Sequence, residues 1–337
     1  MNRSKDNSTT LTHRERLQAC LTDDPSLDRP PVALWRHFPV DDQSPEALAA
    51  ATIAFQRQFD FDLVKVTPAS SFCLKDWGAE DVWEGDPEGT RRYTQRVIEK
   101  AVDWEHLPIL NPRKTPYLSG HLACLRLIRA GLPPETPILQ TVFSPLAQAK
   151  NLVGGARLVV HMRQHPEAVL KGLAAITETT RRFVEACLEI GIDGLFYAVQ
   201  HAQSGLLTRD EYQTFGLPFD LPIFEPARKL WCNLLHLHGE HIYFDLAREY
   251  PCQIVNWHDR ETPPNLSEAA EAFRGALCGG ISQNTVVFGN HTEVQKEADG
   301  ALAQTGGRRF ILGTGCVVPV IAPYGNILAA RRSVEKE

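Results

Sequence analysis

The chain of 337 residues lacks several features that mark particular protein classes. Its eight cysteines are scattered and form no C-x-x-C pair, so a disulfide framework or a four-cysteine zinc knuckle is not expected. No uninterrupted apolar run reaches the roughly 18 residues that a membrane span needs. The polar start, MNRSKDNSTTLTHRER, has no apolar core of the kind found in signal peptides. These absences predict a cytoplasmic protein without a membrane segment.

An excess of positive charge is also missing. The chain has 35 Lys and Arg against 41 Asp and Glu, which gives a net charge of −6. A protein that neutralises nucleic-acid phosphates would be basic, so a small-molecule substrate is the better expectation. With 43% hydrophobic and 23% charged residues, the composition is that of a globular protein with a sizeable core. We expect a disordered tail over residues 1–11 and one domain over 12–332, as a monomer or homodimer.

Strand-like runs alternate with segments of helical period, which predicts repeated βα units around a parallel sheet. Eight strands are expected, the number that closes a (β/α)8 TIM barrel. They cover residues 31–35, 62–67, 137–143, 192–199, 233–238, 252–257, 276–281 and 309–313. The polar, glycine-containing stretch 69–108 breaks the rhythm and predicts an irregular excursion after strand two, such as a small hairpin.

Helices are expected between these strands. The segment 44–59 has Ser44 as a candidate N-cap and Pro45 at the first helical position, and 166–190 also begins with a proline. Further helices are expected at 240–250, 266–273 and 292–304. In a barrel of this kind the chemistry lies at the carboxyl ends of the strands, where histidine occurs at four of the eight positions.

The stretch LLHLHGEH, residues 234–241, contains the densest group of histidines. Because side chains alternate along a strand, His236 and His238 share one face and Leu235 and Leu237 the other. If the leucines pack against outer helices, both imidazoles point into the barrel near its mouth. His241 is expected to begin the following helix, which makes it the weakest ligand candidate.

Cys316 follows the last expected strand in GTGCVVP and is the natural third partner of these two histidines. The flanking glycines allow unusual backbone angles and close approach. Two imidazoles and a thiolate suit a tetrahedral Zn²⁺ with one open position, as in catalytic zinc sites. Such a zinc could activate a substrate thiol as a thiolate nucleophile. The alternative is that the histidines are hydrogen-bonded pocket residues and the cysteine is a buried, inert thiol.

Two further pairs of side chains lie at strand ends. His258 and Asp259 follow the sixth strand, where the carboxylate could orient a metal-bound imidazole or act as a general base. The alternative is a helix N-cap or a surface pair. Gln200 and His201 end the fourth strand, where they are either substrate contacts or satisfied pocket residues.

Arg36 and His37 end the first expected strand and could bind an anionic group of a substrate. The alternative is that Arg36 pairs with a structural carboxylate such as Asp41 or Asp42.

Eight segments, in this order, resemble the uroporphyrinogen decarboxylase superfamily. They are RPPVALWRHFP (29–39), DFDLVKVTP (60–68), FSPLAQAKNLVGG (143–155), GIDGLF (191–196), LLHLHG (234–239), QIVNWHD (253–259), GGIS (279–282) and ILGTGCVVP (311–319). The resemblance covers roughly residues 12–332 and implies a (β/α)8 barrel. The superfamily includes decarboxylases and zinc-dependent methylcobamide:coenzyme M methyltransferases.

The methyltransferase branch is the more similar at the expected metal site. Its members carry H-x-C after strand five and a cysteine in a late G-C-x-x-P turn, which His236, His238 and Cys316 match with one imidazole in place of a thiolate. The decarboxylases carry an R-Q-A-G-R segment, of which only Arg36 is retained. Their catalytic aspartate and tyrosine fall near Ala69 and Asn151, which disfavours uroporphyrinogen decarboxylation.

The resemblance therefore implies a zinc-dependent methyltransferase that moves a methyl group between a corrinoid and a zinc-activated thiol. The corrinoid would be free or carried on a partner protein. The alternatives are a metal-free decarboxylase that acts on a porphyrinogen or a smaller polycarboxylate, and a non-catalytic barrel that binds a corrinoid or tetrapyrrole.

Overall fold

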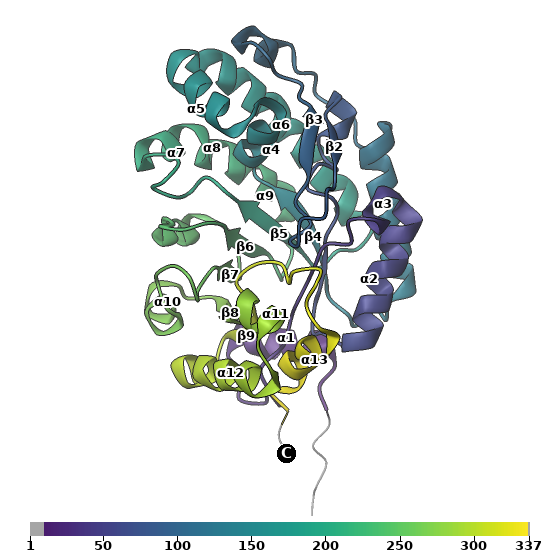
Figure 1. The fold of residues 1–337 in the computed structure, drawn as a ribbon, viewed down its shortest axis with the longest axis vertical. Coiled ribbons are helices and arrows are strands. Elements are labelled where there is room, and N and C mark those ends of the chain that lie inside the picture. The colour runs from purple at the N-terminus through teal and green to yellow at the C-terminus, as the bar shows by residue number, and fades with distance from the viewer. Residues whose placement is uncertain (1–9, 336–337) are drawn as a thin grey trace, which may run out of the picture.

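The computed structural model describes residues 10–335, and its central feature is a curled, parallel, seven-stranded sheet with helices around its outer face (Figure 1). The strand order is β1, β4, β5, β6, β7, β8, β9. The strands are β1 (Val64–Val66), β4 (Ile138–Phe143), β5 (Gly194–Val199), β6 (Leu234–Leu237), β7 (Ile254–Trp257), β8 (Ala276–Ile281) and β9 (Phe310–Thr314). Each strand runs parallel to its neighbours, as the alternation of strands and helices predicts.

The helices begin largely where capping residues and prolines place them. Ser44 accepts a hydrogen bond from Ala47 N and starts α2 (Pro45–Phe59), while α6 (Pro166–Leu188) begins at a proline. The other α-helices are α1 (His13–Thr22), α3 (Pro116–Gly131), α4 (Pro145–Val153), α5 (Gly155–Gln164), α7 (Arg209–Phe215), α8 (Leu217–Asp220), α9 (Phe224–Ala227), α10 (Leu266–Ala272), α11 (Gln283–Phe288), α12 (His291–Thr305) and α13 (Tyr324–Arg332). Within residues 10–335, no helix is long and apolar enough to cross a membrane.

Alternation along the strands divides the core into two layers. Leu234 and Ile254 belong to an inner cluster enclosed by the curled sheet, whereas the adjacent Leu235 and Val255 pack in the larger cluster outside it. Helix α1 contributes Leu17 to the inner cluster. The odd and even positions of β6 therefore face different surroundings, which directs its histidines into the interior.

The expected first strand, residues 31–35, forms only one bridge, between Val32 and Leu312 of β9. Ala33 N donates to Leu312 O at 2.9 Å, and Asp62 N donates to Val32 O at 2.8 Å. The segment thus lies between β9 and the chain just before β1. Pro31 has no N–H to donate, and Val32 N donates to the Asp62 side chain, to Oδ2 at 2.7 Å, so the backbone bonds that would extend a ladder are missing at both residues. The sheet of the described chain is consequently seven-stranded, not eight-stranded.

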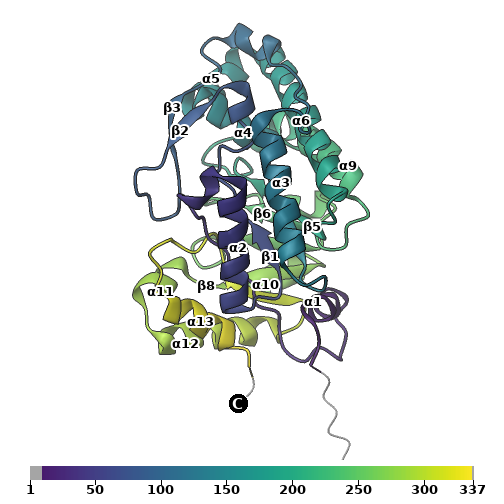
Figure 2. The same cartoon turned by 90° about the vertical axis from the view of Figure 1, so that its right-hand side faces the viewer.

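The irregular excursion contains an antiparallel hairpin of β2 (Glu80–Val82) and β3 (Arg92–Gln95). Figure 2 shows this hairpin beside α4, and the backbone of Val97 and Ile98 donates to Leu152 O at the end of that helix. Five short 3-10 helices complete the fold: Asp41–Gln43, Lys75–Trp77, Ala101–His106, Leu221–Ile223 and Phe244–Glu249. The hairpin expected after strand two is present.

The prediction of a helix over residues 240–250 is wrong. Only the 3-10 turn Phe244–Glu249 forms, and His241 lies in a preceding turn with a φ of 50°. Gly239 also has a positive φ, of 103°. Two left-handed residues so close together cannot continue a right-handed helix.

The tail expected over residues 1–11 falls mostly on residues outside the described range. Within that range, Leu11 N donates to Asp28 Oδ2 at 3.3 Å, and Thr12 caps α1. The proposed division into a tail and a single domain over 12–332 stays a prediction.

Candidate metal centre

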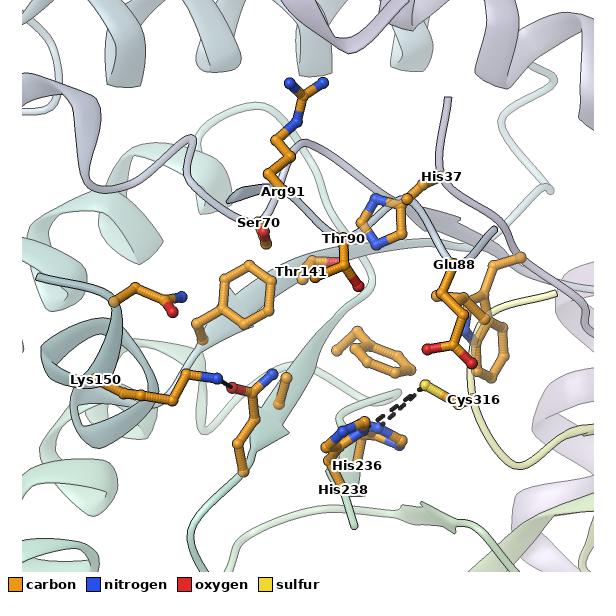
Figure 3. Close-up of a pocket in the computed structure, with 18 of the residues that line it drawn as sticks. His37, Ser70, Glu88, Thr90, Arg91, Thr141, Lys150, His236, His238 and Cys316 are labelled. Carbon is orange, nitrogen blue, oxygen red and sulfur yellow. Dashed lines mark hydrogen bonds between the residues drawn. The ribbon is translucent and has the colours of Figure 1, made fainter. Parts of the chain in front are cut away.

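A cavity of about 410 Å³ opens at the carboxyl ends of the strands. Its wall includes residues from β1, β4, β5 and β6, from the hairpin, and from the turn after β9 (Figure 3). His236, His238 and Cys316 lie together on one side of it, and Lys150 lies on the other. The location agrees with the rule that parallel α/β folds carry their sites at this end of the strands.

His236 is held in one orientation by its neighbour across the sheet. Asn256 of β7 pairs with His236 in the strand register, and its Oδ1 lies 2.7 Å from His236 Nδ1. The Asn256 amide nitrogen donates to the carbonyl oxygens of Cys278 and Thr314, which makes Oδ1 the acceptor. His236 Nδ1 must then carry the proton, and the Nε2 lone pair is free to bind a metal. The ring also stacks on Phe196, with centroids 5.4 Å apart.

Cys316 approaches both histidines of β6. Its Sγ lies 3.8 Å from His236 Nε2 and 3.8 Å from His238 Nδ1. The preceding Gly315 is needed for this approach, because a Cβ there would lie 2.8 Å from His258 Cα. Neither Gly313 nor Gly315 has a positive φ, so the glycines of GTGC allow close packing, not unusual backbone angles.

His258, which follows β7, is the fourth member of this group. Its Nε2 lies 3.2 Å from His238 Nδ1. One ligand atom from each of His236, His238, His258 and Cys316 can be chosen so that all lie within 4.8 Å of one another. His258 was expected to support the ligands or act as a catalytic base; the structure places it among the potential donors themselves.

The spacing and chemistry of these donors fit a zinc ion. Zn–N distances near 2.0–2.1 Å and a Zn–S distance near 2.3 Å put tetrahedral donors roughly 3.3–3.6 Å apart. The nitrogen–nitrogen separation of 3.2 Å between His258 and His238, and the sulfur–nitrogen separations of 3.8 Å from Cys316, are close to these values. Burial, with the neighbouring His258 and Lys150, lowers the pKa of His238 to about 4, which favours the neutral form that binds metals.

The Cys316 thiol is the donor that would change most on binding a metal. Burial raises the pKa of Cys316 to about 12, so the thiol is protonated at neutral pH. A divalent cation beside the sulfur reverses this preference and deprotonates a coordinating thiol. Metal binding at this site would therefore release a proton.

Asp259 lies beside the group but does not belong to it. Its Oδ2 accepts a hydrogen bond from Gly280 N at 3.0 Å, and its Oδ1 is buried without a partner within the described chain. Burial raises the pKa of this carboxyl to about 7. A role as general base stays a proposal, because the carboxylate packs against β8 and is not among the cavity-lining residues.

The four residues expected to bind the substrate are divided between the cavity wall and its surroundings. His37 and Gln200 line the cavity, and Gln200 Oε1 accepts from Lys150 Nζ at 2.7 Å. His201 is only 3% exposed and lies outside the lining. Arg36 does not line the cavity either; its guanidinium lies over the ring of Phe38 and its Nε donates to His37 O.

Five cationic side chains line the cavity without having been expected there, and two of them, Arg91 and Arg92, form ion pairs with carboxylates; the other three are Lys65, Lys150 and Arg96. Lys65 of β1 is 8% exposed, and its Nζ lies 4.5 Å from the ring centroid of Phe196. Lys150 and Arg96 stand on another part of the wall. Their hydrogen bonds go to Thr67, to Gln200 and to backbone carbonyls, and none of the three forms an ion pair within residues 10–335. Burial lowers the pKa of Lys65 to about 7.

Sequence reasoning missed these residues for separate reasons. Lys65 stands in the middle of a strand, although its alternation with Val64 and Val66 could have placed it inside. Lys150 is on a helix, and Arg96 follows the hairpin, whose position over the cavity depends on tertiary packing.

Comparison with known proteins identifies the family. The family model for uroporphyrinogen decarboxylase (URO-D) matches residues 18–337, so the chain belongs to the uroporphyrinogen decarboxylase family. A curated relative, uroporphyrinogen decarboxylase of Geotalea daltonii, is 22% identical over 246 residues, which cover 69% of each chain.

Two solved structures share the fold at low sequence identity. A methyltransferase from Methanosarcina mazei has a TM-score of 0.83 and 18% identity, and the match covers 96% of this chain and 98% of that one. A B12-independent methionine synthase from Shewanella sp. W3-18-1 has a TM-score of 0.56 and 13% identity, and the match covers 90% of this chain and 91% of that one. The family's members are enzymes, and the methyltransferase likeness supports the fold.

Proposed function

We propose that this protein is a zinc-dependent methyltransferase that moves a methyl group between a corrinoid and a zinc-activated thiol or similar acceptor. The observation that carries the proposal is the group of nitrogen and sulfur donors on the cavity wall, with His236, His238 and Cys316 facing the cavity. When bound, zinc would lower the pKa of an acceptor thiol and hold it as a thiolate. The corrinoid is free or carried by a partner protein.

The chain's own residues then orient the donors and receive the acceptor. Asn256 holds His236 with Nε2 toward Cys316, and Phe196 supports the ring from one face. Lys65 and Lys150 give the cavity positive charge that favours an acceptor with an anionic group. His37 and Gln200 add polar contacts on the same wall. The residues proposed for catalysis are Asp259 and His258. A further residue proposed to bind the substrate is His201.

Elemental analysis tests this proposal directly. The purified protein should contain one zinc per chain, and Cys316→Ser should lose both zinc and methyl transfer from a methylated corrinoid to a thiol. A protein without stoichiometric zinc, or a Cys316→Ser variant that keeps its activity, would contradict the proposal.

A second candidate is metal-free decarboxylation of a porphyrinogen or a smaller polycarboxylate. The unpaired Lys65, Lys150 and Arg96 in the cavity favour it, since they suit a substrate with several carboxylates. This alternative predicts carbon dioxide release that persists after treatment with a chelator and is lost in Lys150→Met.

A further inference from the structure

The donor group contains one histidine more than an open catalytic zinc site needs. Three protein ligands and one free position are typical of catalytic zinc, whereas four protein ligands are typical of structural zinc. His236, His238 and Cys316 already supply three donors, and His258 Nε2 lies within the same 4.8 Å group. The role of His258 therefore decides which kind of site this is.

A metal bound by His238 would change the contact between His258 and His238. His238 Nδ1 is the atom that faces both Cys316 Sγ, at 3.8 Å, and His258 Nε2, at 3.2 Å. A metal held by His238 Nδ1 and Cys316 would occupy the Nδ1 lone pair. His258 could then no longer donate a hydrogen bond to that atom, yet its Nε2 would remain at the separation expected of two tetrahedral nitrogen donors.

The backbone of this region is built around His258. Its Cα would lie 2.8 Å from a Cβ at position 315, so only glycine lets the turn after β9 pack against it. The same turn carries Cys316. The close packing of two loops, one after β7 and one after β9, thus places the imidazole and the thiol together.

His258 also differs from the other three donors in its position relative to the cavity. His236, His238 and Cys316 belong to the cavity wall, and His258 does not. A ligand that enters from the cavity therefore meets His236, His238 and Cys316.

We propose that His258 is a fourth protein ligand of the metal, placed on the side away from the cavity, and that an acceptor reaches the metal through the face formed by His236, His238 and Cys316. This inference rests on the proposed function. The four side chains would then all hold the metal in the resting protein, and His236, His238 and Cys316 would form the face that the acceptor meets.

Cobalt substitution tests the inference without an activity assay, because the visible spectrum of Co²⁺ reports the number and type of its ligands. The full chain is loaded with Co²⁺ and compared with His258→Ala, His258→Cys and His241→Asn. His241 is the matched control: it is an exposed histidine three positions from His238, and asparagine tolerates its left-handed backbone.

We expect His258→Cys to bind Co²⁺ and to show roughly twice the thiolate-to-cobalt charge-transfer absorption, because a second thiolate is added to that of Cys316. His258→Ala should bind Co²⁺ at least roughly 10-fold more weakly, with changed ligand-field bands. His241→Asn should match the wild-type protein in both respects. The charge-transfer band is the decisive readout, because the loss of a merely supporting hydrogen bond would also weaken binding.

If Co²⁺ binds and His258→Cys gains no charge-transfer absorption, His258 is not a ligand and this inference is wrong, while the proposed zinc site stands. If the wild-type chain binds neither Zn²⁺ nor Co²⁺, both the inference and the proposed function are wrong. Thermal denaturation of each variant identifies any loss of binding that comes from unfolding.

Discussion

At the residue scale, the orientation of His236 depends on one buried amide. Asn256 is fully buried, and its side-chain amide makes three hydrogen bonds. Its partners are the His236 side chain in β6 and the carbonyl oxygens of Cys278 in β8 and Thr314 in β9. Because all of its hydrogen bonds are specified, the amide cannot turn over. This arrangement selects the tautomer of His236 before any metal binds.

Asn256→Ala should therefore weaken zinc binding by roughly 10- to 100-fold, the usual effect of removing a group that orients a metal-bound histidine. Competition with a chelator at pH 7 measures the change. Asn326→Ala is the matched control, because Asn326 is also a buried amide that donates to two carbonyls, those of Val286 and Gly289. The control should lose stability but keep its zinc affinity; equal affinities in the two variants would contradict the role of Asn256.

Lys65 leads to a prediction about anion binding and pH. Burial lowers its pKa to about 7, so the side chain is protonated below that value and mostly neutral above it. Sulfate, whose charge is constant over this range, should bind more weakly as the pH rises from 6 to 9. Calorimetric titration with sodium sulfate checks this, and Lys65→Met should reduce both the affinity and its dependence on pH.

Lys171→Met is the control for this experiment, because Lys171 is exposed and pairs with Glu105 outside the cavity. Its variant should bind sulfate as the wild-type protein does. If the pH dependence survives in Lys65→Met, the titrating group lies elsewhere.

At the element scale, the hairpin of β2 and β3 is fixed over the cavity by a buried arginine. The Arg91 side chain is 3% exposed and its Nη2 lies 2.5 Å from Asp42 Oδ1, while its Nη1 lies 3.5 Å from Asp81 Oδ1. Asp81 belongs to β2, and Asp42 lies in the turn before α2. One guanidinium thus connects the hairpin with the segment that follows His37.

Arg91→Met should destabilise the protein by about 3 kcal/mol or more, because it leaves the buried Asp42 carboxylate without its cation and leaves Asp81 paired with Lys75 alone. The neighbouring Arg92→Met is the control: Arg92 pairs with Glu84 on the surface, where an ion pair contributes about 0–1 kcal/mol. Urea denaturation gives both free energies of unfolding, and hydrogen exchange should show the loss of protection concentrated in the hairpin. Similar effects of the two substitutions would contradict the anchoring role.

Elements with strong local patterns could be predicted from the sequence, and those set by tertiary contacts could not. The β-branched runs and proline-started helices fall where alternation and capping place them, as α2 and α6 show. Residues 31–35 have a strand-like composition, but Pro31 has no N–H and Val32 N donates to the Asp62 side chain, and only one bridge forms. The 240–250 segment has a helical pattern that the left-handed backbone at Gly239 and His241 overrides.

For the site, strand alternation was enough to place His236 and His238 on one face, and the late turn suggested Cys316. The approach of His258 depends on the packing of two loops against Gly315, and the presence of Arg96 depends on where the hairpin folds. Contacts of this kind join segments far apart in the chain, and a single sequence carries no periodic signal for them.

At the scale of the whole molecule, a network of charges joins the N-terminal helix to the end of the sheet away from the cavity. His13 on α1 contacts Asp60 at 2.9 Å and Asp62 at 3.1 Å, and Arg16 and Arg29 also pair with Asp62. Asp62 is fully buried and also accepts from Val32 N. The network therefore fixes α1 and the 31–35 segment to the residues that lead into β1.

This network predicts a stability contribution that depends on pH. Burial alone would lower the pKa of His13, but hydrogen bonds and charge interactions with Asp60 and Asp62 raise it from 6.5 to about 9. A histidine whose pKa is raised by folding stabilises the protein fully below the unfolded value of 6.5, and the contribution is lost as the pH rises through 9. At about 1.4 kcal/mol per pKa unit, the upper limit is about 3 kcal/mol.

His13→Ala should accordingly lower the free energy of unfolding by the largest amount near pH 6 and by much less near pH 9.5. Urea denaturation at the two pH values measures the difference between wild type and variant, which isolates His13 from the other titrating groups. His291→Ala, at the exposed start of α12, is the control and should show no such trend. A deficit for His13→Ala that is constant or grows with pH would mean that α1 is held by its apolar contacts in the inner cluster, such as those of Leu17, and not by the protonated imidazole.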